Sequence, residues 1–343
     1  MKTETIVLNE TRNVTLTSYT QSVEGEFRNI PNRPAILILP GGGYYFCSDR
    51  EADPVAMPFL KAGYQVFILR YSVDAHAAWP NPLDDYEQAM DTIKSRAGEW
   101  HVYTDKIAVI GFSAGGHLAG AAATLSKNRP AAAILGYPAV TGETIHMCLP
   151  SAPDIPGAVD MNTCPCFVFA TRDDNVVPVK NVLAMIDALD RHGISFETHI
   201  YAYGPHGYST GDMSVLAPDT NICSRADQWV GDSLSWLKDM LGGFGMGRMT
   251  EPSCPRRVNK DGDEFLSVDC TVGYLIKQEA AKSIMAPLIK GAIEQRGAGN
   301  QEELLSFIAN MKLCDAMSSA NMPAEMQGAI AAQLSAIKSV NAK

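Results

Sequence analysis

Short, largely apolar runs recur through the first two-thirds of this chain, and stretches with helical periodicity separate them. The runs that most constrain the fold are residues 35–39, 65–69 and 106–110. A strand that is apolar on both faces is typical of a parallel sheet whose two sides are covered by helices. Strands that alternate with helices in this rhythm therefore predict an α/β fold with a mostly parallel central sheet.

The same alternation continues to about residue 241. Further strands are predicted at 131–135, 166–170 and 196–201, and the alternating polar and apolar stretch 4–20 predicts one or two edge strands. Helices are predicted between the strands, at 54–62, 83–97, 113–125, 179–192 and 228–241.

The α/β pattern stops near residue 242. Glycines crowd residues 242–247, and two prolines follow at 252 and 255. This composition predicts a linker over 243–272, between an α/β domain at 1–242 and a helical C-terminal domain at 273–343. Helix-like stretches at 273–295, 301–312 and 322–339 are rich in apolar residues. These helices are expected to bury an apolar face against another surface. That surface would be a second copy in a homo-oligomer, or the functional site, which the helices would then cap.

The charge balance narrows the range of partners. The chain has 28 Lys and Arg residues and 38 Asp and Glu residues, which gives a formal net charge of −10. An acidic chain repels phosphate backbones and anionic lipid headgroups, so nucleic acid and membrane surfaces are not expected as partners. The N-terminus lacks the apolar stretch of a secretory signal, and the eight cysteines are scattered. We therefore expect reduced thiols and a cytoplasmic protein.

The strongest functional motif is Gly111-Phe-Ser113-Ala-Gly115, where the strand at 106–110 meets the helix at 113–125. A serine at the apex of a tight strand-to-helix turn exposes its hydroxyl, and flanking glycines remove the clash that the strained backbone would cause. The helix N-terminus also favours negative charge near the hydroxyl. Ser113 is thus predicted to be a nucleophile, and a plain glycine-rich turn is the alternative.

A serine hydroxyl needs a general base beside it to act as a nucleophile near neutral pH. Of seven histidines, His206 lies in Tyr203-Gly-Pro-His206-Gly207, directly after the strand at 196–201. A loop that leaves the carboxyl end of a parallel strand lies where ligands bind, so His206 is the predicted base. His117, one helical turn after Ser113, is expected to be structural.

The base needs a carboxylate to orient it. Asp173 and Asp174 both follow the strand at 166–170. We favour Asp174 as the acid, with Asp173 capping the loop, although Asp173 is not excluded at this point. The chain order Ser, Asp, His is that of the α/β-hydrolases and differs from the other serine-protease orders.

An oxyanion that forms during acyl transfer needs backbone N–H groups aimed at it. The run Pro40-Gly-Gly-Gly-Tyr44 follows the strand at 35–39 and allows a close approach of the backbone. The N–H groups of Gly42, Gly43 and Ala114 are the predicted donors, and a merely flexible turn is the alternative. The run lacks the lysine and the glycine spacing of phosphate-binding loops.

Four motifs together resemble a known family, the α/β-hydrolase-3 type esterases, and within it the acetyl-xylan-esterase-like bacterial carboxylesterases. They are Leu39-Pro-Gly-Gly-Gly-Tyr44, Gly111-Phe-Ser-Ala-Gly-Gly-His-Leu-Ala119, Asp173-Asp-Asn-Val-Val-Pro178 and Gly204-Pro-His-Gly207. The resemblance spans about residues 30–240. It implies Ser113 as nucleophile, Asp174 as acid, His206 as base, and Gly42, Gly43 and Ala114 as oxyanion donors. Many relatives carry histidine where this chain has Pro40, but that histidine supports the loop and does not react.

The expected activity is that of a serine carboxylesterase on short-acyl esters, such as acetyl groups on sugars or xylo-oligosaccharides, with no cofactor and no metal. A short, proline-rich connection between the strands at 131–135 and 166–170 leaves little room for a lid. Five aromatic residues are expected either to stack on substrate or to pack in the core: Tyr44, Tyr45, Trp79, Tyr137 and Tyr208. A peptidase, an acyltransferase, or a non-catalytic binding protein that keeps the fold are the alternatives.

Overall fold

The computed structural model describes residues 1–296 and 301–340. The chain divides into two compact units, Met1–Arg256 and Arg257–Lys343. Each unit has its own hydrophobic core. The division falls between residues 256 and 257, inside the stretch 243–272 that the sequence predicts as a linker.

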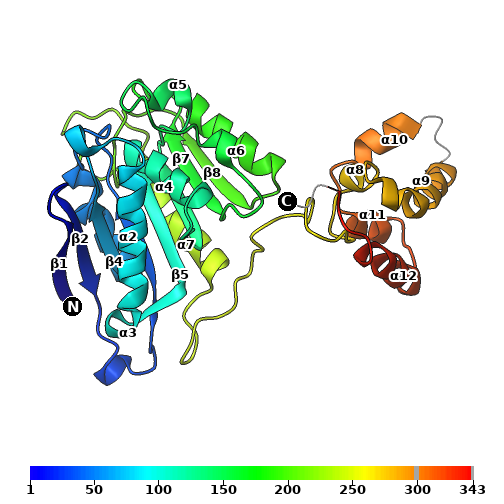
Figure 1. The fold of residues 1–343 in the computed structure, drawn as a ribbon, viewed down its shortest axis with the longest axis horizontal. Helices are drawn as coiled ribbons and strands as arrows, with labels where there is room; N and C mark the ends of the chain where they lie inside the picture. Colours follow the sequence, from blue (N-terminus) through cyan, green and yellow to red (C-terminus); the bar gives the residue numbers. More distant parts are fainter. Residues whose placement is uncertain (297–300, 341–343) are drawn as a thin grey trace. The chain divides into compact units, whose positions relative to one another are not determined.

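An eight-stranded sheet forms the centre of the larger unit, in the order β1-β2-β4-β3-β5-β6-β7-β8 (Figure 1). The first two pairings, β1 with β2 and β2 with β4, are antiparallel, and the strands from β4 to β8 are parallel. The strands are β1 Lys2–Asn9, β2 Val14–Thr20, β3 Arg33–Leu39, β4 Gln65–Arg70, β5 Val102–Phe112, β6 Ala132–Gly136, β7 Cys166–Thr171 and β8 Phe196–Tyr201. The fold class expected from the sequence is therefore confirmed.

Burial explains why the central strands are so apolar. Every residue of β3 is buried, and β6 and β7 are buried throughout. Val109 of β5 is paired with Leu37 on one side and Ala133 on the other, so its strand has no exposed edge. The edge strand β8 is fully buried only at Tyr201, and it accordingly carries the consecutive polar residues Glu197, Thr198 and His199.

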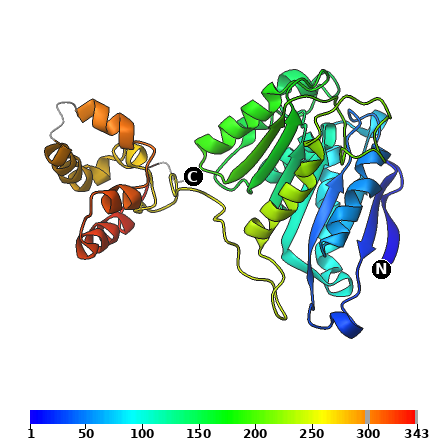
Figure 2. The same ribbon diagram turned by 180° about the vertical axis from the view of Figure 1, so that it is seen from behind.

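Helices cover both faces of the sheet. Helix α2 lies in front of the sheet in Figure 1, and α7 lies in front of it in the reverse view of Figure 2. Helix α4 is buried along its whole length, because its alanines and glycines allow it to pack closely on β5 and β6. The helices of this unit are α1 Asp53–Lys61, α2 Asn81–Ser95, α3 Ala97–Trp100, α4 Ala114–Thr124, α5 Gly142–Ile145, α6 Lys180–Arg191 and α7 Trp229–Leu241. Short 3-10 helices lie at η1 Gly25–Phe27, η2 Asp49–Glu51, η3 Asp74–His76, η4 Pro156–Ala158 and η5 Ala226–Gln228.

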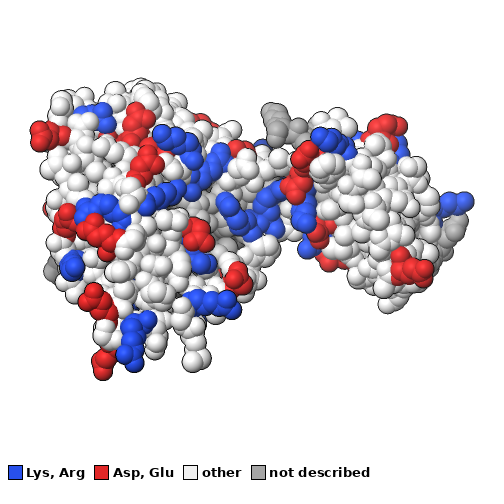
Figure 3. Space-filling view, turned by 60° about the horizontal axis from the view of Figure 1, so that its bottom comes forward, with Lys and Arg blue, Asp and Glu red and all other residues white. Residues whose placement is uncertain are grey.

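The smaller unit is helical. Its elements are α8 Val272–Leu275, η6 Glu279–Ala281, α9 Lys282–Arg296, α10 Gln301–Ile308, α11 Leu313–Ser319 and α12 Ala324–Ser335. Leu275, Leu313 and Leu334 belong to its core, and an antiparallel bridge joins Thr271 to Lys312. Figure 3 shows a face of this unit that carries few charged side chains.

Two helix predictions for this region were wrong. The stretch 273–295 is not one helix, because the backbone leaves helical geometry at Gln278, whose side chain is buried. The helix predicted at 301–312 ends at Ile308, and α11 starts anew after Lys312, whose backbone is extended. In the part of the chain that the structure describes, no helix is long and apolar enough to cross a membrane.

Candidate active site

Ser113 lies at the turn between β5 and α4 in a strained backbone conformation, with φ of 52° and ψ of −117°. The chain tolerates this turn because glycines flank it. A Cβ added at Gly111 would lie 2.0 Å from the carbonyl oxygen of Gly115, and one at Gly115 would lie 2.1 Å from that of Leu39. Any larger residue at either position would force the turn apart, so the motif is a steric requirement of the exposed hydroxyl.

Three side chains from distant segments form a continuous hydrogen-bonded row. Ser113 Oγ lies 2.8 Å from His206 Nε2, and His206 Nδ1 lies 2.7 Å from Asp174 Oδ2. The Asp174 side chain is fully buried, whereas that of His206 is 15% exposed. The carboxylate accepts the Nδ1 proton, which leaves Nε2 as the acceptor for the serine hydroxyl.

The two neighbouring aspartates do different things. The second oxygen of Asp174 accepts the N–H groups of Val176 and Val177, both at 2.9 Å, and these bonds fix the carboxylate. Asp173 instead accepts the Gly204 N–H at 2.8 Å, at the start of the loop that carries His206. The structure thus places Asp174, and not Asp173, against the imidazole.

The glycine loop after β3 supplies N–H groups beside Ser113. Gly42 and Gly43 have positive φ angles of 129° and 64°, and a Cβ at Gly42 would lie 2.1 Å from the carbonyl oxygen of Phe46. Within the described part of the chain, the N–H groups of Gly42, Gly43 and Ala114 have no hydrogen-bond acceptor. All three residues line the pocket that contains Ser113 and His206. Unpaired N–H groups at this place can donate hydrogen bonds to a substrate oxygen.

This pocket has a volume of about 350 Å³ and opens between the loops at the carboxyl ends of the strands. Its mouth is apolar: Tyr45, Phe46, Met147 and Val176 are each more than half exposed. The remaining lining comprises Gly42, Gly43, Ser48, Arg50, Glu51, Ser113, Ala114, Ala139, Thr144, Ile145, Cys148, Val177, His206 and Gly207. Phe46, Arg50, Glu51 and Met147 lie outside the four motifs, so the sequence analysis missed them; Val176 lies inside a motif but was not assigned to the site.

The expected aromatic contacts with substrate need correction. Tyr44, Tyr137 and Tyr208 are at most 1% exposed, so they pack in the core and cannot stack on a sugar. Trp79 packs edge-on against His117 and does not line the pocket. Only Tyr45 of the five both lines the pocket and is exposed.

His117 is hydrogen-bonded to Tyr44, the residue that directly follows the glycine loop. Its Nε2–H donates to the Pro153 carbonyl at 2.8 Å, so its Nδ1 accepts the Tyr44 hydroxyl, also at 2.8 Å. Complete burial lowers the pKa of His117 to about 4, which keeps the ring neutral. The tautomer follows from the partners, because a carbonyl oxygen can only accept.

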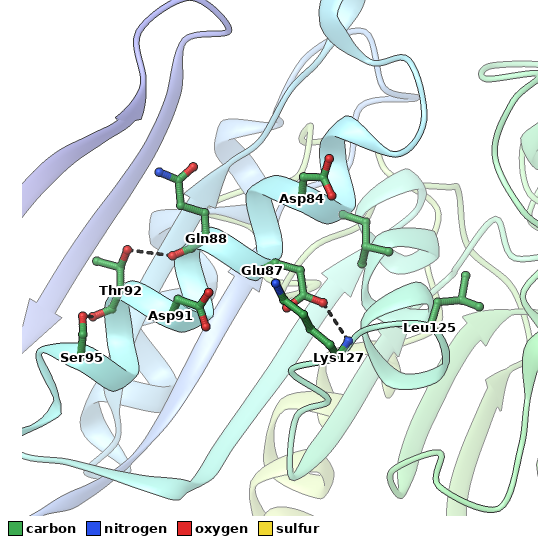
Figure 4. Close-up of a pocket in the computed structure, with 9 residues that line it drawn as sticks. Asp84, Glu87, Gln88, Asp91, Thr92, Ser95, Leu125 and Lys127 are labelled. Carbon is green, nitrogen blue, oxygen red and sulfur yellow. Dashed lines mark hydrogen bonds between the residues drawn. The ribbon is translucent and has the colours of Figure 1, made fainter.

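A second hollow, of about 670 Å³, lies on the outer face of α2 (Figure 4). Its polar wall is formed by Asp84, Glu87 and Asp91, and Glu87 accepts the backbone N–H of Lys127 at 2.9 Å. It contains no serine–histidine pair, so it offers no comparable chemistry. In the described ranges 1–296 and 301–340, no group of three or more His, Cys, Asp or Glu side chains could hold a metal ion.

A serine on a strand-to-helix turn, joined to histidine and aspartate at one edge of a mostly parallel sheet, defines the α/β-hydrolase class. Comparison with known proteins agrees. A family model described as BD-FAE matches residues 28–137. The solved structure of MGS-M1, an α/β-hydrolase enzyme from a Medee basin deep-sea metagenome library, is 44% identical, with a TM-score of 0.66. That match covers 70% of this chain and 98% of MGS-M1.

Two esterases are more distant relatives. The carboxylesterase Cest-2923 from Lactobacillus plantarum is 26% identical, with a TM-score of 0.66, over 71% of this chain and 100% of that one. The acetylxylan esterase of Xylanibacter ruminicola is 28% identical over 61% of this chain and 46% of that protein. This chain therefore spans less than half the length of that curated relative. The chain belongs to the α/β-hydrolase family, and its homologues include carboxylic ester hydrolases.

Proposed function

We propose that this chain is a serine carboxylesterase that removes short acyl groups, such as acetyl, from sugars or xylo-oligosaccharides. The observation that carries the proposal is the position of His206, which lies within hydrogen-bond distance of both Ser113 and Asp174. The site has the three groups that acyl transfer requires: a nucleophile, a base with a fixed tautomer, and free N–H donors beside them.

In the first step, Ser113 Oγ attacks the ester carbonyl carbon while His206 Nε2 takes the hydroxyl proton. The carbonyl oxygen becomes negatively charged and accepts hydrogen bonds from the N–H groups of Gly42, Gly43 and Ala114. The buried Asp174 carboxylate stabilises the imidazolium that forms. The tetrahedral intermediate then collapses, and His206 returns the proton to the departing alcohol.

In the second step, water replaces the alcohol. The water oxygen attacks the carbonyl carbon of the acyl-enzyme while His206 takes a proton from the water. The same three N–H groups donate hydrogen bonds to the second oxyanion. Collapse of this intermediate returns the proton to Ser113 Oγ and releases the carboxylic acid.

The shape of the pocket supports a short acyl group. The connection between β6 and β7 is short, and it contributes Ala139, Thr144, Ile145, Met147 and Cys148 to the lining of the pocket. A volume of about 350 Å³ lies near the lower end of the usual range for ligand pockets. The exposed faces of Tyr45 and Phe46 offer stacking surfaces for a sugar ring outside the acyl site.

A panel of aryl esters of increasing acyl length, together with acetylated xylo-oligosaccharides, tests the proposal. We expect kcat/KM to be highest for acetyl and propionyl esters and to fall for acyl chains of eight carbons or more. Highest activity on the long chains would contradict the short-acyl proposal.

Ser113→Ala is the control for the chemistry. We expect kcat to fall by a factor of about 10⁴ or more, because the nucleophile is lost while the N–H donors stay. A fluorophosphonate should label the wild type and not this variant. Failure to label the wild type would favour a binding protein that retains the fold.

A further inference from the structure

A second carboxyl group, Glu51, lies buried beside the active site. It ends the short helix η2 and is 3% exposed. Its Oε2 accepts the backbone N–H of Gly41 at 2.8 Å, and its Oε1 accepts the hydroxyl of Tyr137 at 2.6 Å. Gly41 immediately precedes the glycines assigned to the oxyanion, so Glu51 is bonded to the base of that loop.

The contacts of Glu51 continue to the loop that carries the base. The Tyr137 hydroxyl oxygen accepts the Ser209 N–H at 3.0 Å, and the Tyr137 ring packs edge-on against His206 with centroids 5.1 Å apart. The Ser209 hydroxyl donates a hydrogen bond to the backbone carbonyl of Arg50, the residue before Glu51. The Glu51 carboxylate therefore joins the glycine loop to Tyr137, which follows β6, and Tyr137 joins both to the loop that carries His206.

The Glu51 carboxylate lies close to a glycine of each of the two loops. A Cβ on Gly41 would lie 2.7 Å from Glu51 Oε2, and one on Gly207 would lie 3.9 Å from Glu51 Oε1. The carboxylate thus lies close to the glycine that precedes the oxyanion donors and within van der Waals reach of the glycine that follows His206.

The direction of each hydrogen bond is fixed by chemistry. The N–H groups of Gly41 and Ser209 can only donate. The Tyr137 hydroxyl donates its single proton to Glu51 Oε1, so Glu51 accepts at both oxygens. A carboxylate does this, whereas a glutamine side chain offers only one acceptor and turns its NH₂ group toward a donor. Burial raises the pKa of Glu51, but the bonds from Tyr137 and Gly41 oppose that rise by stabilising the charged form.

We propose that Glu51 is the positioning residue that holds the oxyanion loop and the base loop in one geometry: directly through Gly41, and through Tyr137 and Ser209. The inference rests on the proposed esterase function. Glu51 acts through the groups it holds and takes no part in bond making. Loss of one of its two bonds lets the oxyanion donors and His206 drift relative to each other, which weakens binding of the transition state more than binding of the ester.

The test compares Glu51→Gln with Asp85→Asn. Asp85 is a fully buried carboxylate in α2 that accepts the Ser72 N–H at 2.8 Å and pairs with Arg12, outside the pocket lining. Both variants lose a buried acceptor, so both are expected to lower Tm. Only Glu51→Gln should lower kcat on an aryl acetate, by about 10- to 100-fold, with KM changed less than about threefold.

A kcat of Glu51→Gln within about twofold of the wild type would overturn the proposal. An equal loss of kcat in Asp85→Asn at the same change in Tm would also overturn it, because destabilisation alone would then explain the effect. Glu51→Asp keeps two acceptor oxygens on a shorter side chain and should recover part of the lost kcat.

Hydrogen exchange by mass spectrometry separates this proposal from the esterase proposal, because it needs no turnover. Glu51→Gln should speed exchange in peptides that cover residues 40–47 and 204–210, and Asp85→Asn should speed neither. Tyr137→Phe, which keeps the Gly41 bond, should speed 204–210 more than 40–47. Unchanged exchange in both peptides of Glu51→Gln would refute the positioning role whether or not the wild type hydrolyses esters.

Discussion

At the scale of single residues, the role of each side chain in the site depends on the group from which it accepts a hydrogen bond. Asp173 and Asp174 are neighbours with the same chemistry, yet one bonds to the backbone of Gly204 and the other to His206. Identical substitutions at the two positions therefore separate an effect on loop structure from an effect on the orientation of the base.

Asp174→Asn should lower kcat by a factor of about 10⁴, since the amide can donate to His206 Nδ1 and impose the wrong tautomer. Asp173→Asn should cost stability of about 1 kcal/mol through the Gly204 bond and leave kcat within a few-fold of the wild type. Steady-state kinetics and urea unfolding of both variants provide the check. A larger kcat loss in Asp173→Asn would exchange the assigned roles.

The buried His117 links stability to pH. Its pKa is about 4 in the folded chain, against 6.5 for the free side chain. Between these values the unfolded chain binds more protons, so the free energy of unfolding falls as pH drops from about 6.5 to about 4. The full difference corresponds to a contribution on the order of 3 kcal/mol that is present above this window and lost below it.

His117→Gln removes the titrating group while keeping an amide that can bond to Pro153 and Tyr44. We expect the free energy of unfolding of this variant to vary less between about pH 4.5 and about pH 7 than that of the wild type. Denaturant unfolding at both pH values measures the difference. Equal pH dependence in the two proteins would show that His117 is not the source.

At the scale of elements, the turn from β5 to α4 determines how the nucleophile is presented. Its glycines are needed for space and not for flexibility, since Gly115 has the carbonyl of Leu39 where a Cβ would be. Gly231, in α7, has nothing within 4 Å of the same position, so it provides a matched control in the same unit.

Gly115→Ala is expected to destabilise the larger unit by about 3 kcal/mol or more, because the backbone of β3 or α4 must shift. Gly231→Ala is expected to stabilise it by about 1 kcal/mol, since alanine favours an exposed helix. Thermal unfolding of both variants tests the pair. A tolerated Gly115→Ala would mean that the close packing of α4 on β3 is looser than the structure indicates.

At the scale of the whole molecule, all residues of the proposed site lie in Met1–Arg256, which has its own core. The largely uncharged face of the helical unit in Figure 3 is consistent with the expectation that this unit mediates self-association, which stays a prediction.

A chain that ends after Arg256 should keep kcat on aryl acetates within about threefold of the full chain. Calorimetry of the full chain should show two transitions, one of which disappears on truncation, because each unit has its own core. Light scattering before and after truncation tests self-association. Loss of turnover in a folded truncated protein would show that the helical unit completes the site.

The order of elements in the larger unit follows from the sequence, because strands buried on both faces must be apolar and because β and helical periodicities differ. The Ser113, Asp174 and His206 assignments rest on short motifs with strict local geometry. Local pattern was weaker in the helical unit, where a buried Gln278 breaks an otherwise helical stretch.

Tertiary structure alone decided which groups meet. An aromatic residue looks the same in sequence whether it faces solvent or core, so Tyr45 could not be told from Tyr44, Tyr137 and Tyr208. Glu51 lies in no motif, and its two hydrogen-bond partners, Gly41 and Tyr137, come from segments far apart in the chain. Periodicity and motifs report constraints between near neighbours in the chain, whereas these contacts depend on how the loops close over the sheet.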